Sequence, residues 1–248
     1  MLNLINRNKT AMNSRRKFLL QGTLATTALI VAKPFKTIAN TFAPATGLNS
    51  NNSKLVLLHT GFHHSHNWHH TVDRIASLKK NTGNLLLLHT GAINNAPDAQ
   101  MKYDVTMPED ISNSSYQIFY KGNIKTAVIY AAQGENDVVK KVAALSTRLK
   151  KEKNCDVVVC LSQLGFKNKN EVDDIQLANE SSHLDIILSS NPGHTSMRAY
   201  IARNSKKEEV IINFTAGKNM DFGNIEMTFD ENRNKKSVAI NNLRQAHA

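Results

Sequence analysis

Acidic side chains are absent from the first forty residues, which nevertheless hold seven of the chain's 31 lysines and arginines. The formal charge of +11 is therefore concentrated in this segment, and the rest of the chain carries 24 basic groups (31 less 7) against all 20 acidic ones. So close a balance is typical of an ordinary solvated surface and not of the basic face that holds nucleic acid. We expect no nucleic-acid partner.

The same segment lacks an apolar run long enough to cross a bilayer, which takes about 20 residues. Its apolar stretch covers only residues 22–32, and it follows residues 14–20 (SRRKFLL), which resemble the twin-arginine export motif. We expect residues 1–40 to be a signal peptide, 41–53 a polar linker and 54–248 a domain. The resemblance implies a periplasmic or otherwise exported protein with no membrane span once the signal is removed. The alternative is an amphipathic N-terminal helix with a chance arginine pair.

Cysteine is scarce: Cys155 and Cys160 are the only two, and they flank one predicted strand. Five residues of extended chain place their Cα atoms about 16 Å apart, which is too far for a disulfide bond. We predict two buried free thiols.

Short apolar runs alternate with segments of helical period along residues 54–248. Strands are predicted at residues 55–59, 85–89, 116–120, 124–131, 156–161, 184–188, 209–214, 224–229 and 237–241, and helices at 71–80, 134–153 and 170–178. Residues 90–115 have no period and are predicted as loop. The last three strands alternate apolar and polar residues, which predicts an antiparallel tail with one solvated face. The expected fold is α/β, a layered α/β sandwich with mixed β-sheets.

Six histidines gather in residues 54–70 (KLVLLHTGFHHSHNWHH), at and after the end of the first predicted strand. A strand that opens into a ligand-rich loop is where open α/β sheets place their binding sites. Imidazole suits zinc, copper and nickel, so this loop could hold a single metal ion. No carboxylate precedes Asp73 in the loop, however, and neighbouring side chains on a loop diverge. A mononuclear metal site and a set of solvent-exposed polar side chains both remain open.

Several segments, in order, resemble the metallophosphoesterase (calcineurin-like) superfamily, in its 5′-nucleotidase branch. The first matching segments are LLHT at 57–60 with His64 (family LHTNDxH), the strand at 87–91, and GNIKTAVI at 122–129 (GxKVGVIG). Two longer ones follow, CDVVVCLSQLG at 155–165 (ADVVIxLSHLG) and DIILSSNPGHT at 185–195 (DLIIGGHSHT). The last are the closing TAG, FGN and FD at 215–217, 222–224 and 229–230. Together they cover residues 54–230. The resemblance implies a shortened metallophosphoesterase-like sandwich.

The family's chemistry uses two metal ions that activate a bound water, and carboxylates between the ions offset their repulsion. When the family's ligand positions are matched to this sequence, most of them hold other residue types. Phe62 and Ala92 stand where the resemblance requires aspartates, and Gln163 stands for a ligand histidine. Asn191 or Ser190 stands for another histidine, and the family's GNHE element has no counterpart in residues 92–116. His64 and His194 keep the family's residue type.

Three functions follow from this comparison. The first is an exported nucleotidase-like protein that has lost dinuclear-metal phosphoester hydrolysis and serves a binding role. The second is an active phosphoesterase with a rebuilt metal site at His64, His66 and His194. The third is a mononuclear metal-binding protein that uses the histidine loop. We favour the first, in which the chain is not an active hydrolase and no cofactor is expected. If a metal binds, it is a divalent zinc, manganese or iron ion, and the partner classes considered are a protein and a nucleotide-like small molecule.

Overall fold

The computed structural model describes residues 53–61, 68–91, 103–108, 111, 116–166, 171–189, 199–215 and 220–244. The chain divides into two units, residues 1–46 and 47–248, and every described residue belongs to the second. The predicted signal peptide, and the predicted linker up to residue 52, therefore lie outside the described residues. In the part of the chain that the structure describes, no helix combines the length and the apolar character needed to span a membrane.

The first of two mixed sheets is arranged around the apolar strand β1. Its strands are β1 (Ser53–Thr60), β2 (Leu85–His89), β3 (Val105–Thr106), β10 (Met220–Phe229), β11 (Lys235–Ile240) and β12 (Leu243–Arg244). The order is β11-β10-β1-β2-β3, and β12 pairs with β10. β1, β2 and β3 run parallel, whereas β10 is antiparallel to β1, β11 and β12. β1 therefore joins the parallel and antiparallel halves of this sheet.

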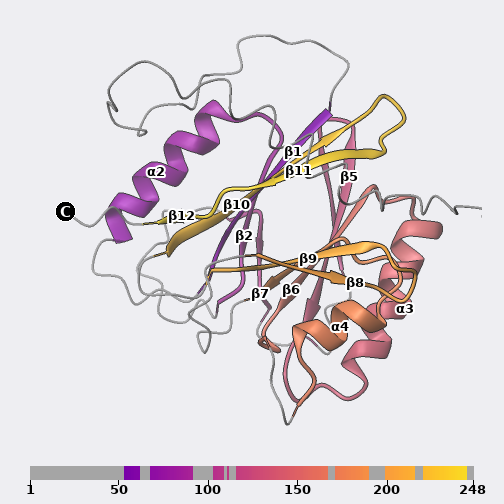
Figure 1. Ribbon diagram of the computed structural model, residues 1–248. Helices are drawn as coiled ribbons and strands as arrows, with labels where there is room; N and C mark the ends of the chain where they lie inside the picture. The colour runs from indigo at the N-terminus through magenta and orange to yellow at the C-terminus, as the bar shows by residue number, and fades with distance from the viewer. Residues whose placement is uncertain are drawn as a thin grey trace, which may run out of the picture. The chain divides into compact units, whose positions relative to one another are not determined.

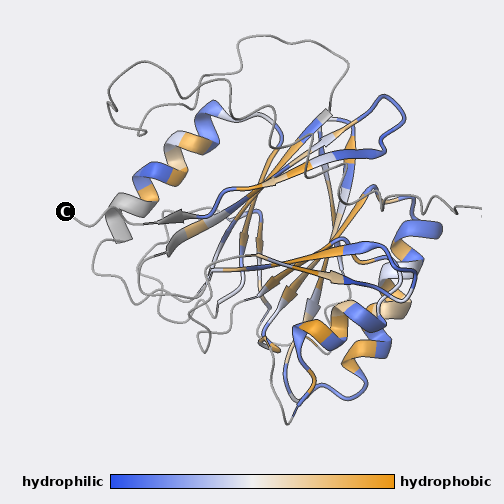
Figure 2. Cartoon of the chain, in the orientation of Figure 1, coloured by the Kyte–Doolittle hydropathy of each residue, from blue (hydrophilic) through white to orange (hydrophobic). Residues whose placement is uncertain are grey.

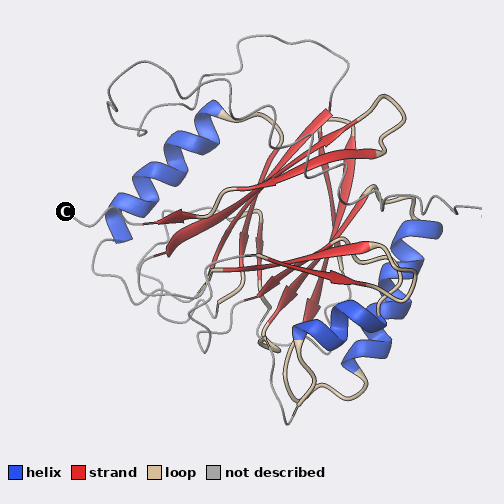
Figure 3. Cartoon of the chain, in the orientation of Figure 1, coloured by secondary structure: helices blue, strands red, loops and turns tan. Residues whose placement is uncertain are grey.

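The second sheet has a parallel centre with an antiparallel strand at each edge. Its strands are β4 (Gln117–Lys121), β5 (Ile124–Ala131), β6 (Val157–Ser162), β7 (Ile186–Ser189), β8 (Tyr200–Arg203) and β9 (Glu209–Phe214). The order is β4-β5-β6-β7-β9-β8. β5, β6, β7 and β9 are parallel, while β4 and β8 pair antiparallel with β5 and β9. The two sheets are shown as red arrows in Figure 3.

The sheets and helices form four layers, with three apolar cores between them (Figure 1). The central core joins the facing sides of the two sheets, for example Leu57 on β1 and Val159 on β6. A second core lies between the other face of the second sheet and helices α3 (Val138–Lys151) and α4 (Asp174–Glu180). A smaller third core packs α2 (Trp68–Asn81) on the first sheet through Ile75. Figure 2 shows hydrophobic colour along the strands and hydrophilic colour on much of α3. The expected α/β sandwich with mixed sheets is confirmed.

The helix boundaries differ from the predicted ones for local reasons. α3 begins at Val138 and not at residue 134, because Asp137 has a φ of 56°, outside the helical region. α4 begins at Asp174 and not at residue 170, because Asp173 is extended and its side chain accepts a hydrogen bond from the backbone N–H of Gln176. α2 begins at Trp68, three residues before the predicted start.

The predicted strands are all present, but three short strands and one strand direction were missed. β3, β8 and β12 contain four residues or fewer, so their sequences carry little periodicity. The prediction of an antiparallel tail is wrong for β9, which pairs parallel with β7. Its residues after Glu209 are buried on both faces, because α4 covers one side and the first sheet covers the other.

Cys155 and Cys160 are both buried and both free, as predicted. Burial raises the pKa of both thiols, and that of the fully buried Cys160 most. Neither thiol is therefore suited to nucleophilic chemistry.

Candidate functional site

Polar residues replace the apolar core where the parallel strands end. We call this region the carboxyl edge; it comprises residues 59–61, 89–91, 162–163, 189 and 213–215. The ends of β1 and β9, which belong to different sheets, meet there: a Cβ atom added to Gly61 would lie 2.6 Å from Thr215 Oγ1. Only glycine fits at position 61 without displacing that hydroxyl. The carboxyl edge is therefore a place where the two sheets touch directly.

β1 and β2 end in a hydrogen-bonded group of three side chains. The Thr60 hydroxyl donates to Tyr103 Oη at 3.2 Å, which leaves it to accept from His89 Nδ1 at 2.8 Å. The His89 and Tyr103 rings lie 4.9 Å apart between centroids. Burial lowers the pKa of His89 to about 4, so the imidazole is neutral at pH 7. His89 is thus held as part of the packing between the two strands.

His59 is fully buried and fixed by an amide network from the opposite sheet. Asn213 Nδ2 donates to His59 Nε2 at 2.8 Å, so the imidazole proton resides on Nδ1. Asn213 and Asn242 also exchange two amide hydrogen bonds of 3.0 and 2.9 Å. Burial lowers the pKa of His59 to about 3. Gly223 makes this packing possible, because a Cβ atom there would overlap His59 Nε2.

A buried carboxyl group joins the ends of β6 and β7. Asp174 is 0% exposed, and its Oδ1 accepts a 2.5 Å hydrogen bond from Ser162 Oγ. Asp174 Oδ2 and Ser189 Oγ, which is also buried, have no hydrogen-bond partner of good geometry among the described residues, although the Ser189 hydroxyl acts on the Asp174 carboxyl. Burial raises the pKa of Asp174 to about 6, against smaller opposite effects of the Ser162 and Ser189 hydroxyls. This carboxyl group adjoins the carboxyl edge through Ser162.

The described donors do not fit the pair of metal ions that the family resemblance implies. Two close cations need bridging carboxylates, whereas hydroxyl and amide groups dominate the carboxyl edge. The two histidines there, His59 and His89, each use a ring nitrogen within the protein, and Asp174 is enclosed against Ser162. Among the described residues, no three His, Cys, Asp or Glu side chains are grouped to hold a metal.

The predicted metal ligands His64, His66 and His194 lie outside the described residues, as do Phe62 and Ala92. The metal-site prediction therefore stays a prediction. Positions 190 and 191, compared above with a ligand histidine, are also outside the described part of the chain. Gln163 is described: it is half-buried at the end of β6, and its backbone N–H donates to the carbonyl of Ala131 at 2.9 Å.

Sequence reasoning missed the residues that organise the carboxyl edge. Asn213 and Thr215 had one available signal, namely two polar residues at alternate positions at the end of an otherwise apolar strand. Asp174 lies in a segment predicted only as a short helix, and nothing in its neighbourhood in the sequence distinguishes it from the half-buried Asp173. Asn242 lies in the polar segment after β11 and carries no signal.

The opposite ends of the same strands are charged. We call this region the amino edge; it comprises Asp156 and Asp185 with the cations around them. Asp156 Oδ2 accepts from the backbone N–H of Lys125 on β5, and Asp185 Oδ2 accepts from Val158 on β6, both at 2.8 Å. Each aspartate side chain thus satisfies a backbone N–H donor near the start of a neighbouring parallel strand.

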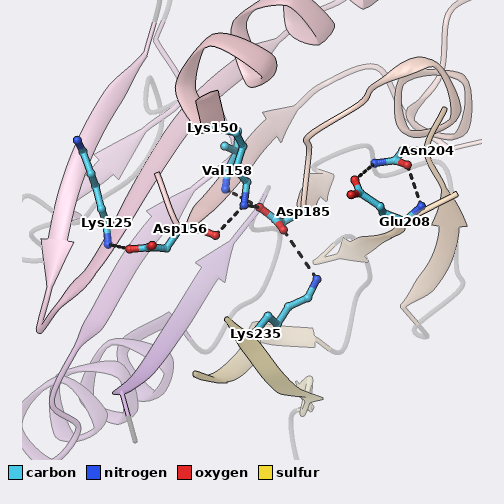
Figure 4. Close-up of polar contacts among 8 residues, drawn as sticks. All are labelled: Lys125, Lys150, Asp156, Val158, Asp185, Asn204, Glu208 and Lys235. Atoms are coloured by element: carbon cyan, nitrogen blue, oxygen red, sulfur yellow. Dashed lines mark hydrogen bonds and ion pairs between the residues drawn. The ribbon is translucent and has the colours of Figure 1, made fainter. Parts of the chain in front are cut away.

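Lysines from two layers converge on these aspartates (Figure 4). Lys150 Nζ contacts Asp185 Oδ2 and the carbonyl of Asp156, both at 2.7 Å. Lys235, from β11 of the first sheet, lies 3.8 Å from Asp185 Oδ1. A cavity of about 410 Å³ opens beside them, with Glu208 on its wall, itself bonded to Asn204 at 2.9 Å. The cavity carries both signs of charge and lies at the edge opposite to His59.

Comparison with solved structures gives the fold a context. The chain is similar to NAD nucleotidase (NadN) from Haemophilus influenzae, with a TM-score of 0.58 and 16% identity, over 78% of this chain and 50% of that one. It is also similar to a 5′-nucleotidase precursor from Thermus thermophilus, with a TM-score of 0.56 and 13% identity, over 77% of this chain and 54% of that one. No family model and no curated protein sequence matches the chain. The chain spans about half the length of either structure and has a shortened nucleotidase-like, metallophosphoesterase-type fold.

Proposed function

We propose that this chain is an exported, nucleotidase-like protein that has lost dinuclear-metal phosphoester hydrolysis and serves a binding role. In this proposal residues 1–40 direct export to the periplasm, residues 41–53 form a linker, and the remainder is the binding domain. The partner is a protein or a nucleotide-like small molecule. The similarity to 5′-nucleotidases supports the fold in this proposal, and the side chains of this chain support the loss of chemistry.

The observation that carries the proposal is the state of His59 and His89. Both lie where β1 and β2 end, and both are buried neutral groups whose ring nitrogens bond to Asn213 and Thr60. A metal ligand must present a lone pair to an open coordination position. His59 presents its Nε2 lone pair to the Asn213 amide, and His89 donates its Nδ1–H to Thr60. The described strand ends around them offer hydroxyls in place of bridging carboxylates.

The test measures bound metal and turnover on the same preparation. The mature chain is loaded with zinc, manganese or iron(II), desalted, and assayed by elemental analysis and by hydrolysis of p-nitrophenyl phosphate and AMP. We expect fewer than two ions per chain and no turnover above the buffer rate. Two ions per chain together with metal-dependent turnover would contradict the proposal.

The alternative metal site at His64, His66 and His194 is separated by substitution. One ion per chain that is lost in the His64→Ala, His66→Ala double variant, without turnover in either protein, identifies a histidine-loop metal binder. Metal-dependent turnover that needs His194 as well identifies a rebuilt phosphoesterase. Substitution of the half-buried His183 is the matched control, because it removes an imidazole at the amino edge, beside Lys206.

A further inference from the structure

The cavity at the amino edge is lined by residues of both sheets. Asp185 and the two residues before it come from the segment that leads into β7, and Glu208 comes from the turn between β8 and β9. Lys235, at the start of β11, comes from the first sheet. The volume of about 410 Å³ lies within the range of small-molecule sites. Leu184 is the one apolar residue among those that line the cavity, so its walls suit a polar ligand.

Asp185 and Lys235 form an ion pair that leaves hydrogen bonds unmade. Lys235 Nζ lies 3.8 Å from Asp185 Oδ1, beyond hydrogen-bond distance, and the two side chains are 36% and 16% exposed. The other oxygen, Oδ2, already accepts from the Val158 N–H and from Lys150. Among the described residues, nothing donates to Asp185 Oδ1 or accepts from Lys235 Nζ. The cavity wall therefore holds a donor and an acceptor that a ligand can use.

Glu208 adds a second carboxylate, whose position is set by a buried amide. Asn204 is 5% exposed, and its Nδ2 donates to Glu208 Oε2 at 2.9 Å. Its Oδ1 accepts from the backbone N–H groups of Lys206 and Glu208, both at 2.9 Å. No described residue donates to Glu208 Oε1. Figure 4 shows the Glu208 carboxylate pointing toward the side on which Asp185 and Lys235 lie. Because Asn204 already restricts this side chain, a ligand that binds it pays less conformational entropy.

The charges on the walls decide which class of ligand fits. Three carboxylates (Asp185, Glu208 and Glu209) and two ammonium groups (Lys150 and Lys235) line the cavity. Lys150 is already bonded to Asp185 at 2.7 Å. An anion without an ammonium group would meet three carboxylates, and a cation without an anionic group would leave Lys235 without an acceptor. A molecule that carries both an ammonium and a carboxylate group can make charge-assisted hydrogen bonds to both kinds of wall.

We propose that the amino-edge cavity binds a small zwitterion of the amino-acid type. Its ammonium group donates to Glu208 Oε1 and Asp185 Oδ1, and its carboxylate accepts from Lys235 Nζ. His183 adds a donor to the wall: its Nε2 accepts from the Lys206 ammonium at 2.7 Å, so its Nδ1 carries the proton. The cavity lies at the end of the strands opposite to His59, so this site is independent of whether phosphoester hydrolysis has been lost.

The test titrates the ¹⁵N-labelled protein with unbranched ω-amino acids, from glycine to 6-aminohexanoate, and follows the backbone amide signals by NMR. We expect saturable shifts at the amides of His183, Asp185 and Glu208, and the chain length that binds most tightly reports the spacing between the two ends of the site. The alkylamine and the alkyl carboxylate of that length each lack one charge and should bind at least about 10-fold more weakly. The absence of saturable binding across the series overturns the proposal, as does equal binding of either single-charge analogue.

Two substitutions separate the ends of the site. Glu208→Gln keeps an oxygen for the Asn204 amide and removes the charge, and Lys235→Gln removes the ammonium group. Both side chains are exposed, so the fold should tolerate these changes. Each should weaken binding of the zwitterion by about 10-fold or more. Glu208→Gln should also abolish the preference over the alkyl carboxylate, and Lys235→Gln the preference over the alkylamine.

Glu231→Gln and Lys236→Gln are the matched controls. They remove the same charges from exposed positions near the same β10–β11 turn, and neither residue lines the cavity. Both should bind the zwitterion as the wild-type protein does. If they weaken binding as much as the two cavity variants do, the attraction is a general effect of surface charge and the proposal is overturned.

Discussion

The carboxyl edge and the amino edge lie at opposite ends of the same strands, and they join the two sheets by different means. At the carboxyl edge His59 meets Asn213 through a neutral hydrogen bond of 2.8 Å between fully buried groups. At the amino edge Lys235 of the first sheet lies 3.8 Å from Asp185, whose side chain is 16% exposed. One junction excludes water and charge, and the other consists of charges that water reaches.

The difference bears on the proposed loss of phosphoester hydrolysis. In open α/β sheets the carboxyl ends of the strands carry the reactive and ligand-binding groups. Here burial keeps the two described histidines at that edge neutral, while lysine and aspartate charges gather at the amino edge. The carboxyl edge therefore behaves as a packed junction, and this supports a binding role over hydrolysis.

The largest effect is expected from Gly223→Ala, which breaks the carboxyl-edge junction. The added methyl group would overlap His59 Nε2 and lie 2.9 Å from Asn213 Nδ2, and both side chains are fixed. We expect a loss of more than about 3 kcal/mol in the free energy of unfolding, measured by urea denaturation. Gly83→Ala is the control: no atom lies within 4 Å of its Cβ position, and its cost should stay within about 0.5 kcal/mol. Equal effects would show that the junction is not tightly packed.

A pH titration of stability should also separate the two edges. His59 and His89 have folded-state pKa values of about 3 and 4 against 6.5, so the unfolded chain binds more protons. Their contribution is present above pH 6.5 and is lost as the pH falls, at up to about 1.4 kcal/mol per pH unit for each histidine. Asp174 acts in the opposite direction between pH 3.8 and 6, which leaves a net loss in acid. Imidazole NMR signals of His59 that titrate near pH 6.5 would refute the burial argument.

The smallest expected difference between the two edges is in how salt changes the cost of a substitution at each. Asp185→Ala leaves the Val158 N–H without its acceptor and removes the carboxylate that pairs with the Lys150 ammonium. Asn213→Ala removes the amide bonds to His59 and Asn242. Each should cost about 1–3 kcal/mol in the free energy of unfolding at low salt. At 1 M NaCl the Debye length is about 3 Å, so the cost of Asp185→Ala should shrink while that of Asn213→Ala should not. The opposite ranking would mean that the amino edge is the drier junction.

Much of the fold could be predicted because its signals are local. The apolar runs of β2 and β6 identify buried strands within a few residues, and the lysine-rich C-terminus of α3 identifies a helix end. The direction of β9 could not be predicted, since burial on both faces depends on α4 and on the first sheet. The carboxyl edge was harder still, because its contacts depend on how the strands are ordered in two separate sheets.

The sequence by itself determined the longer strands and the buried thiols, because each depends on residue type and on spacing over a few positions. Only the tertiary structure decided which partners His59 and Asp174 contact and how far burial shifts their pKa values. His59 and Asn213 are 154 residues apart in sequence and meet because β1 and β9 end at the same place. Burial then fixes their ionisation, since the free energy of a charge depends on the surroundings that the whole fold supplies and not on neighbours in the sequence.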